Sequence, residues 1–547
     1  MLVQLNNFFT KLTPRYKLLI ILIIAAVLRF YNLQDKGFIL WDEAQYAKYT
    51  QFGYSVLHNI DFVIESVNNN NISEEVFKSR LKGSLPFGTP KPGHMVNTTI
   101  FSYFFGNYPY SDFFCSAFFG LATVIAIFLL VRNLLNTNYA LLAAFFLAIS
   151  PFNIYYSRLG MAETDASFFL LLSMLFFSNY IYLNKHKSLF IILSGLSCGW
   201  FFVCNYRWVY LIPFFLLAIL IEGIFQKKTI KYFLFFIISF LSFLVFFQIV
   251  YTIGGKLFNV GYSGGYFGMM IDWYSHQMGK SKGIYPHTLY LDILSFLNSY
   301  SFMFLLLIGL AVIFKSIKFN SHQSYIYILL FCFVIIPLAI FSFKIRGDKL
   351  VAVSVIAPFT IIHSIFGIKY LLSYFKTLTY TKSKIANIFL AIVLVYSILY
   401  QMNINKKIIS YKSGYSNVNQ WLKDENVTKY FATEYAVFNY YSGREANVLK
   451  LTNNRQKTKN LVEGGYHYLI MDIHKWYHGP GTPFQFYKEI ENELEPVIIF
   501  ENNAFNFFPY IIDDFHYRHK DEKFMSDLFS DPDNNKIKIY DLRQFYN

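Results

Sequence analysis

Charged residues are scarce in this sequence of 547 residues: only 15% are Asp, Glu, Lys or Arg, whereas 55% are hydrophobic and 21% are aromatic. A soluble protein of this size cannot bury so much apolar surface, so the composition predicts an integral membrane protein. Cysteine is scarce as well, and no pair has the spacing of a zinc knuckle or a disulfide framework. The four cysteines lie within or at the ends of apolar runs: Cys115, Cys198, Cys204 and Cys332.

Apolar runs long enough to cross a bilayer, roughly 20 residues each, recur from the N-terminus to about Met402. No small-residue cleavage site follows the first run, Leu18 to Leu28, so we interpret it as an uncleaved span. The runs predict a polytopic α-helical membrane protein with about 11 transmembrane helices. Their centres lie near Ile23, Ala122, Phe146, Leu172, Leu193, Phe215, Phe240, Leu305, Leu329, Ala357 and Ile392.

The formal net charge of +15 would suggest a nucleic-acid partner in a soluble protein, but here most Lys and Arg lie in short connections between apolar runs. We therefore interpret them as topology signals and expect no nucleic acid. With the basic N-terminus in the cytoplasm, four basic connections become cytoplasmic: 185–187, 226–231, 315–318 and 376–384. Three regions then lie outside: 32–111, 252–290 and everything after about 403.

The long apolar runs end near residue 402, which predicts two domains. Residues 1–402 form a transmembrane domain whose first extracytoplasmic loop is 32–111. Residues 403–547 contain short apolar runs separated by helix-compatible stretches, which is typical of an α/β layer fold. Examples of the runs are Tyr430–Ala432, Tyr468–Met471 and Val497–Phe500. This tail has no glycine-rich phosphate loop, so we expect an extracytoplasmic soluble α/β domain without a nucleotide site.

Two adjacent acids, Asp42 and Glu43, open a helix-compatible stretch immediately outside the first span. A carboxylate at this place could act as a base for chemistry at the membrane surface. Alternatively, Asp42 caps the helix and Glu43 favours its positive end.

A second group of charges, Arg158, Glu163 and Asp165, lies between the third and fourth spans. Ionisable residues at the membrane rim are candidates for function, here the two acids for catalysis and Arg158 for binding a phosphate. The alternative is that the two acids are solvated residues at a helix start, paired with Arg158.

Three bases, Lys344, Arg346 and Lys349, lie before the tenth span on the face where positive charge is normally depleted. Such bases can hold a phosphate whose lipid tail stays in the bilayer. Arg207, in another short external turn, is a candidate of the same kind. The alternative is that these side chains extend to anionic headgroups.

The motif Asp42-Glu43-Ala44-Gln45-Tyr46-Ala47 resembles the Asp-Glu-Ala-x-Tyr-Ala signature of the GT-C glycosyltransferases, in the branch of the protein O-mannosyltransferases and aminoarabinose transferases. The stretch from Ala148 to Glu163 is similar to that family's turn between the third and fourth spans. Lys91-Pro92 is similar to its Lys-Pro-Pro element, although Gly93 replaces the second proline. Phe341 to Arg346 is similar to its late external loop.

The resemblance implies the GT-C fold and an inverting transfer of a sugar from a polyprenyl-phosphate donor to an acceptor hydroxyl. It implies that Asp42 is the base, that Glu163 completes the site and that Lys91 contacts the donor phosphate. The acceptor would be a secreted protein, a lipid or a surface polysaccharide. Oligosaccharyltransferases share the broad fold, but their Trp-Trp-Asp motif is missing from residues 403–547, so we do not favour that activity.

Two other classes fit the hydrophobicity: a multi-span lipid or glycan transporter or flippase, and a non-enzymatic membrane assembly protein. A transporter would be expected to show internal repeats and broken helices at mid-membrane depth. We expect no required cofactor and treat a divalent metal as optional. His58 and His94 lack ligand spacing and are expected to be ordinary loop histidines. High Phe, Tyr, Ile, Lys and Asn usage indicates an AT-rich bacterial genome, which predicts a bacterial inner membrane.

Overall fold

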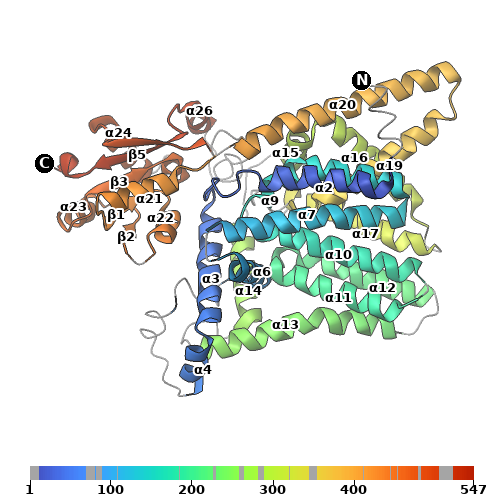
Figure 1. Ribbon diagram of the computed structural model, residues 1–547, viewed down its shortest axis with the longest axis horizontal. Helices are drawn as coiled ribbons and strands as arrows, with labels where there is room; N and C mark the ends of the chain where they lie inside the picture. The colour runs from blue at the N-terminus through green and yellow to red at the C-terminus, as the bar shows by residue number, and fades with distance from the viewer. Residues whose placement is uncertain are drawn as a thin grey trace.

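The computed structural model describes residues 12–68, 81, 89–106, 109–183, 185–225, 230–257, 264–280, 289–318, 321–343, 354–410, 412–443, 445–452, 454–478, 482–503 and 522–546. Apolar helices lie side by side in one body, and a smaller body built around a sheet follows at one end of it (Figure 1). This arrangement confirms the predicted fold class.

Long apolar helices form the larger body, as the hydrophobic runs predict. Seven helices in the described part of the chain are long and apolar enough to cross a membrane, or eight if a bent pair counts as one span. All the predicted span centres fall within helices, but α2 and α16 have only 17 residues each, about 26 Å at 1.5 Å per residue. The total of eleven therefore stays a prediction. The helices are α2 (Pro14–Phe30), α7 (Pro109–Leu134), α8 (Thr137–Ile149), α9 (Pro151–Ser157), α10 (Ala162–Tyr182), α11 (Lys187–Cys204), η2 (Tyr206–Leu211), α12 (Ile212–Phe225), α13 (Lys231–Leu257), α15 (Leu289–Asn298), α16 (Tyr300–Ser316), α17 (His322–Phe343), α19 (Ala357–Phe375) and α20 (Tyr380–Ser410).

The bent pair is α8 and α9, which meet at an angle of 58°. Pro151 begins α9, and because proline has no N–H it cannot continue the hydrogen bonds of α8. The carbonyls left at the end of α8 are satisfied by buried side chains instead. The Arg29 guanidinium donates to the carbonyls of Leu147 and Ala148 at 3.2 and 3.1 Å. The Asn405 amide donates to the carbonyl of Ile149 at 2.7 Å. These hydrogen bonds fix the bend between α8 and α9 and connect both α2 and α20 to it.

Helix α3 stands across one end of the apolar helices, on the side of the sheet (Figure 1). It belongs to the predicted first external loop, and the other helices of the predicted external loops lie near it. The turns 185–187, 315–318 and 376–384, which are predicted to be cytoplasmic, lie toward the opposite end of the apolar helices (Figure 1). Most of the fourth, 226–231, lies outside the described residues. The helices in question are α3 (Trp41–His58), α4 (Ile60–Asn68), α6 (Pro92–Phe105) and α14 (Gly265–Lys280).

The smaller body is a mixed sheet in the order β2-β1-β3-β5-β4, in which β1 pairs in parallel with β2 and β3, and β5 runs antiparallel to β3 and β4. Side chains alternate between its faces. Phe431 and Leu469 pack with α24, whereas Tyr430 and Ile470 belong to the core that includes α21 and α22. Its elements are α21 (Tyr415–Asp424), β1 (Lys429–Ala432), α22 (Tyr435–Tyr441), β2 (Asn447–Leu449), α23 (Arg455–Glu463), β3 (Tyr468–Met471), η3 (Ile473–His478), α24 (Thr482–Glu493), β4 (Ile498–Glu501), α26 (Glu522–Ser530), β5 (Lys536–Asp541) and α27 (Arg543–Tyr546).

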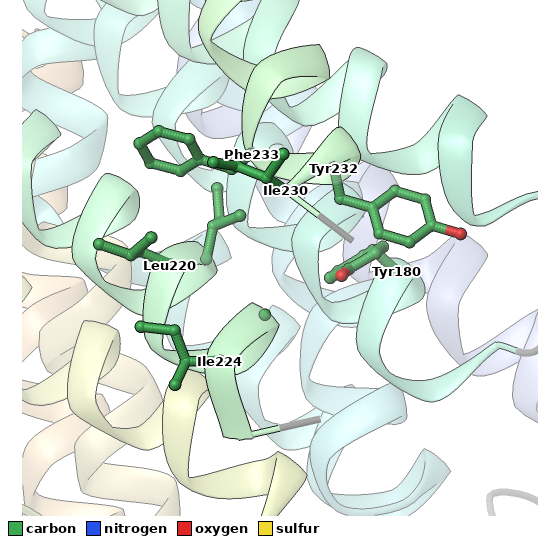
Figure 2. Close-up of a pocket in the computed structure, with 8 residues that line it drawn as sticks. Tyr180, Leu220, Ile224, Ile230, Tyr232 and Phe233 are labelled. Carbon is green, nitrogen blue, oxygen red and sulfur yellow. The ribbon is translucent and has the colours of Figure 1, made fainter. Parts of the chain in front are cut away.

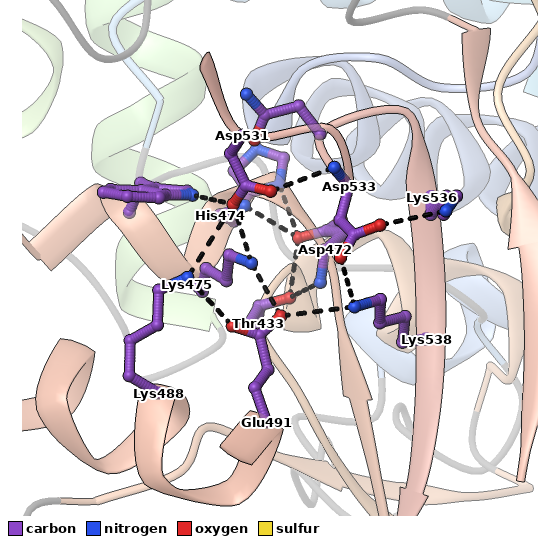
Figure 3. A network of polar contacts seen from close by, with 12 residues as sticks. Thr433, Asp472, His474, Lys475, Lys488, Glu491, Asp531, Asp533, Lys536 and Lys538 are labelled. Carbon is purple, nitrogen blue, oxygen red and sulfur yellow. Dashed lines mark hydrogen bonds and ion pairs between the residues drawn. The ribbon is translucent and has the colours of Figure 1, made fainter. Parts of the chain in front are cut away.

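A polar network joins the segments that follow β3 to the start of β5 (Figure 3). The buried Lys475 ammonium lies 2.7 Å from Glu491 and 3.0 Å from Asp531. Although burial raises the pKa of Asp531, the charge of Lys475 holds it below its ordinary value. Asp533 in turn pairs with Lys536 and Lys538. Because acids and bases pair with each other throughout, we interpret this network as structural.

Arg29→Met tests whether Arg29 stabilises the bend between α8 and α9 at Pro151. The substitution leaves two buried carbonyls and the Asn153 amide oxygen without the guanidinium, and each unsatisfied buried group costs about 1–3 kcal/mol. We expect a clearly lower thermal unfolding midpoint in detergent. Arg15→Met, on the exposed part of the same helix, should have little effect. Equal midpoints for both variants would contradict this account of the break.

Candidate active site

The first turn of α3 is held by the carboxylate of Glu43, which is fully buried. Its Oε2 accepts hydrogen bonds from the backbone N–H groups of Ile39 and Leu40 at 2.7 and 2.8 Å. Its Oε1 accepts from the Lys36 ammonium at 2.9 Å and from the N–H of Gly160 at 3.0 Å. Glu43 therefore caps its own helix and joins it to the turn before α10. With four donors on two oxygens, it is suited to hold the site together.

Arg158 and Lys36 are buried in the same region. The Arg158 guanidinium donates to the carbonyls of Arg29 and Tyr31 at 3.1 and 2.8 Å, which closes the end of α2. Burial lowers the pKa of Lys36 to about 8, the charge of Glu43 opposes this shift, and the charge of Arg158 adds to it. These contacts give Arg158 a structural position, whereas the sequence suggested a phosphate contact.

Lys91 and Glu163 form a buried ion pair, with 2.9 Å between Nζ and Oε1. Lys91 precedes α6, and Glu163 lies in the first turn of α10. The Asn205 amide donates to the same carboxylate oxygen at 3.1 Å. Glu163 Oε2 has no hydrogen-bond partner among the described residues although it is buried. The pair therefore has one carboxylate oxygen left for a ligand.

Asp165 lies one half-turn further along α10 and is held by α6. Its Oδ2 accepts from the Asn97 amide at 2.8 Å and lies 2.9 Å from His94 Nδ1. The Trp200 indole donates to the Asn97 amide oxygen at 3.2 Å, which fixes the orientation of the amide. Asp165 Oδ1 and His94 Nε2 are buried and have no hydrogen-bond partner in the described part of the chain.

Tyr46 lies one helical turn after Asp42 in α3 and beside Lys91 and His94. Burial raises the pKa of the Tyr46 hydroxyl well above its ordinary value, the negative charges of Asp42 and Glu163 raise it further, and Arg207 acts in the opposite direction. The Lys91 ammonium lies 5.2 Å from the centre of the Tyr46 ring. The ring also makes an edge contact with His94, with 5.2 Å between centroids. The Tyr46 ring thus contacts Lys91 and His94, the residues that pair with the two acids of α10.

The structure divides the predicted site residues into three sets. In the first set, Lys91 lies beside the Tyr46 ring and pairs with Glu163. Asp165 bonds His94, which contacts the same ring, and the charges of Asp42 and Arg207 act on the Tyr46 hydroxyl. Glu43 and Arg158 form the second set, the buried joint, in which Glu43 bonds the turn before α10 and Arg158 bonds the end of α2. The third set, Lys344, Arg346 and Lys349, lies outside the described residues.

Three sequence interpretations are corrected by these contacts. The N-cap of α3 is Leu40, so Asp42 is not the helix cap. The acids of α10 are not paired with Arg158, because Glu163 pairs with Lys91 and Asp165 with His94. His94 is not a loop histidine, since it lies fully buried in α6.

Sequence reasoning missed Lys36, His94, Asn97, Asp112 and Asn205. One signal was available: Lys91, His94 and Asn97 follow each other at intervals of three, which lines up one face of a helix. Asp112, whose Oδ2 lies 3.2 Å from the Thr50 hydroxyl, had no comparable signal, because its partner is 62 residues away.

The described residues contain no group of three His, Cys, Asp or Glu side chains arranged to hold a metal ion. A pocket at the other end of α10, lined by Tyr180, Tyr232 and Phe233 among others, is a separate feature (Figure 2). Tyr180 lies about 25 Å along the helix from Glu163. This pocket is therefore too far away to form part of the site that contains Glu163 and Asp165, which we call the acid cluster.

Glu43→Gln tests the assignment of Glu43 to structure. The substitution leaves the Lys36 charge buried without its partner, which costs about 3–5 kcal/mol. We expect the purified variant to unfold at a clearly lower temperature in detergent. The neighbouring change Asp42→Asn should alter the unfolding free energy by no more than about 1 kcal/mol. A Glu43→Gln protein as stable as the wild type would contradict the assignment.

Comparisons with known proteins agree with this architecture. Residues 90–259 match the family model described as dolichyl-phosphate-mannose-protein mannosyltransferase. No curated protein sequence matches the chain.

Solved structures match over most of the chain. The Archaeoglobus fulgidus oligosaccharyltransferase AglB, in complex with an inhibitory peptide and a dolichol-phosphate, matches with a TM-score of 0.54 and 12% identity over 86% of this chain and 71% of its own. The same enzyme with Zn and sulfate gives 0.52 and 14%, over 84% and 69%. ArnT from Cupriavidus metallidurans, bound to undecaprenyl phosphate, gives 0.54 and 11%, over 89% and 96%.

Proposed function

We propose that this protein, whose fold is that of the GT-C glycosyltransferase superfamily, transfers a sugar from a polyprenyl-phosphate donor to an acceptor hydroxyl. The observation that carries the proposal is the buried Lys91–Glu163 ion pair beside the ring of Tyr46, which lies one helical turn after Asp42 in α3. These residues lie on the side of the apolar helices from which α3 and the sheet extend (Figure 1). The likeness to AglB with dolichol-phosphate and to ArnT with undecaprenyl phosphate supports a donor of this class.

The chemistry requires one base and positive charge. Asp42 takes the proton of the acceptor hydroxyl as its oxygen attacks the anomeric carbon of the donor. The bond from that carbon to the phosphate breaks, and the phosphate leaves with the electron pair. Cations stabilise the departing phosphate. Attack from the face opposite the phosphate inverts the anomeric configuration.

Lys91 is the described cation best placed for the phosphate. Its ammonium has three donors, and one of them bonds Glu163, the single side-chain acceptor of Lys91 among the described residues. Arg207, half-buried and close enough to influence Tyr46, is the second cation. Lys344, Arg346 and Lys349 remain proposed phosphate contacts from their sequence positions. Positive charge from these side chains leaves a divalent metal optional, although a relative carries Zn and sulfate.

Glu163 and Asp165 are proposed to shape the site beside Asp42. Each has one buried carboxylate oxygen without a hydrogen-bond partner in the described part of the chain. Hydroxyl groups of a bound sugar would satisfy these oxygens, since a buried unpaired acceptor is costly. Glu43 and Arg158 are proposed to support the site indirectly, by fixing the backbone groups to which they are hydrogen-bonded.

We further propose the orientation and the domain division. The N-terminus lies in the cytoplasm of a bacterial inner membrane, and the active site and sheet lie outside. Residues 1–402 carry catalysis, and residues 403–547 form the external domain, although α20 itself continues to Ser410. The peptide bound to the archaeal relative supports a protein acceptor, with a lipid or a polysaccharide as the other candidates.

Asp42→Asn should abolish transfer of radiolabelled sugar from polyprenyl-phosphate donors. Loss of general-base catalysis lowers the rate by about 10²–10⁴-fold, and the folded protein should persist. Asp35→Asn is the matched control, because Asp35 is exposed and pairs with Lys412 in the same external region. Equal incorporation by both variants and the wild type would remove Asp42 from the mechanism. No incorporation by any of the three proteins would favour a transporter or an assembly protein. The destination of the label identifies the acceptor.

Lys91→Gln should weaken the donor interaction. A hydrogen bond to a charged group contributes about 1.5–3 kcal/mol, so KM for the donor should rise about 10- to 100-fold. Lys412→Gln, which removes an exposed ammonium, should leave KM unchanged. An unchanged KM in Lys91→Gln would exclude Lys91 as a phosphate contact.

A further inference from the structure

An apolar groove opens between α16, α19 and the first part of α20, at the end of the helices opposite the sheet. Its volume is about 500 Å³. Nearly all of the lining is hydrophobic, and the one charged residue in it is Lys382. The groove is lined by Phe304, Leu371, Phe375, Ala386 and Phe389, among others.

The groove exists because α20 stands away from its neighbours over its first turns. The buried residues of α20 begin at Leu390, so none lies in the ten residues before it. Helices α16 and α19, in contrast, pack closely: a Cβ added at Gly309 would collide with the carbonyl of His363. The apolar side chains Ile385 and Phe389 are therefore left more than 60% exposed.

Positive charge surrounds the open end of the groove. Lys376, Lys382 and Lys384 flank the turn between α19 and α20, and all three are exposed. They make no hydrogen bond or ion pair with the residues that the structure describes. The sequence contains no Asp or Glu between Asp348 and Asp424, so no acid from this stretch can neutralise them.

We propose that the groove binds one acyl chain of an anionic glycerophospholipid, with the lipid phosphate on Lys382. An apolar groove with a cation at its mouth matches a molecule with an apolar chain and an anionic head. Basic clusters at the cytoplasmic ends of membrane helices attract the anionic lipids of that leaflet. The bound lipid fills the space that α20 leaves and steadies its first turns against α16 and α19.

The polyprenyl-phosphate donor is not the occupant of this groove. The acid cluster around Tyr46 lies at the opposite end of the helices, about the thickness of a bilayer core, or roughly 30 Å, away. A phosphate held by Lys382 could not reach Asp42. The groove therefore differs from the proposed active site in both place and ligand, and its existence does not depend on the proposed function.

The experiment uses the full chain in nanodiscs that contain phosphatidylcholine and increasing phosphatidylglycerol, with retained lipid measured by native mass spectrometry. We expect the wild type to retain phosphatidylglycerol preferentially and to unfold at a higher temperature as its fraction rises. Lys382→Gln should weaken retention about five-fold, the contribution of one basic side chain near the membrane surface. Lys382→Arg should preserve retention.

Two further variants separate the groove from general surface attraction. Ala386→Trp fills the groove and should abolish preferential retention without removing charge. Lys315→Gln removes an exposed lysine of α16 at the same end but outside the lining, and should have no effect. Equal losses in Lys382→Gln and Lys315→Gln, or unchanged retention in both Lys382→Gln and Ala386→Trp, would overturn the proposal. Displacement of phosphatidylglycerol by polyprenyl phosphate at lower concentration would overturn it as well.

Discussion

The buried carboxylate of Glu43 is the contact on which the rest of the site depends. It ties the start of α3 to Lys36 on one side and to the N–H of Gly160 on the other. Because Gly160 lies just before α10, this one side chain brings the turn that carries Asp42 against the turn that carries Glu163 and Asp165. A single carboxylate thus joins two regions that are 117 residues apart in sequence.

The surroundings of that joint follow from the rule that buried polar groups must be paired inside an apolar body. Arg29 satisfies carbonyls that the break at Pro151 leaves open, and Arg158 satisfies those at the end of α2. The two arginines hold backbone, so the acids beside them can keep a fixed geometry. Near Tyr46 the hydrogen bonding of buried acids is incomplete. One oxygen each of Glu163 and Asp165 is buried without a hydrogen-bond partner among the described residues. This contrast distinguishes the candidate active site from the joint that supports it.

Much of the architecture could be predicted from hydrophobic runs alone. The apolar stretches became helices, and the runs at Tyr430, Tyr468 and Ile498 became β1, β3 and β4. The acids at 42 and 163 were identified because charge is rare beside apolar spans and because the motif around Asp42 resembles a known signature.

The pairing of these residues could not be predicted, because it depends on how distant turns meet. Lys91 and Glu163 are 72 residues apart, and no local pattern links them. The same reason explains why Glu43 and Arg158 looked like site residues: their charge was visible in the sequence, but the backbone groups that they bond were not. The spacing of His94 from Lys91 and Asn97 indicates a shared helix face, but the role of His94 depends on Asp165 in another helix.

We propose that the acceptor oxygen displaces the donor phosphate in one step at the site around Tyr46, with Asp42 as the base. The most direct measurement is the anomeric configuration of the transferred sugar, determined by NMR on the product and compared with that of the donor. We expect inversion, because the acceptor oxygen attacks opposite the departing phosphate. Retention would contradict it, since retention requires either a second displacement or attack from the face that the phosphate leaves.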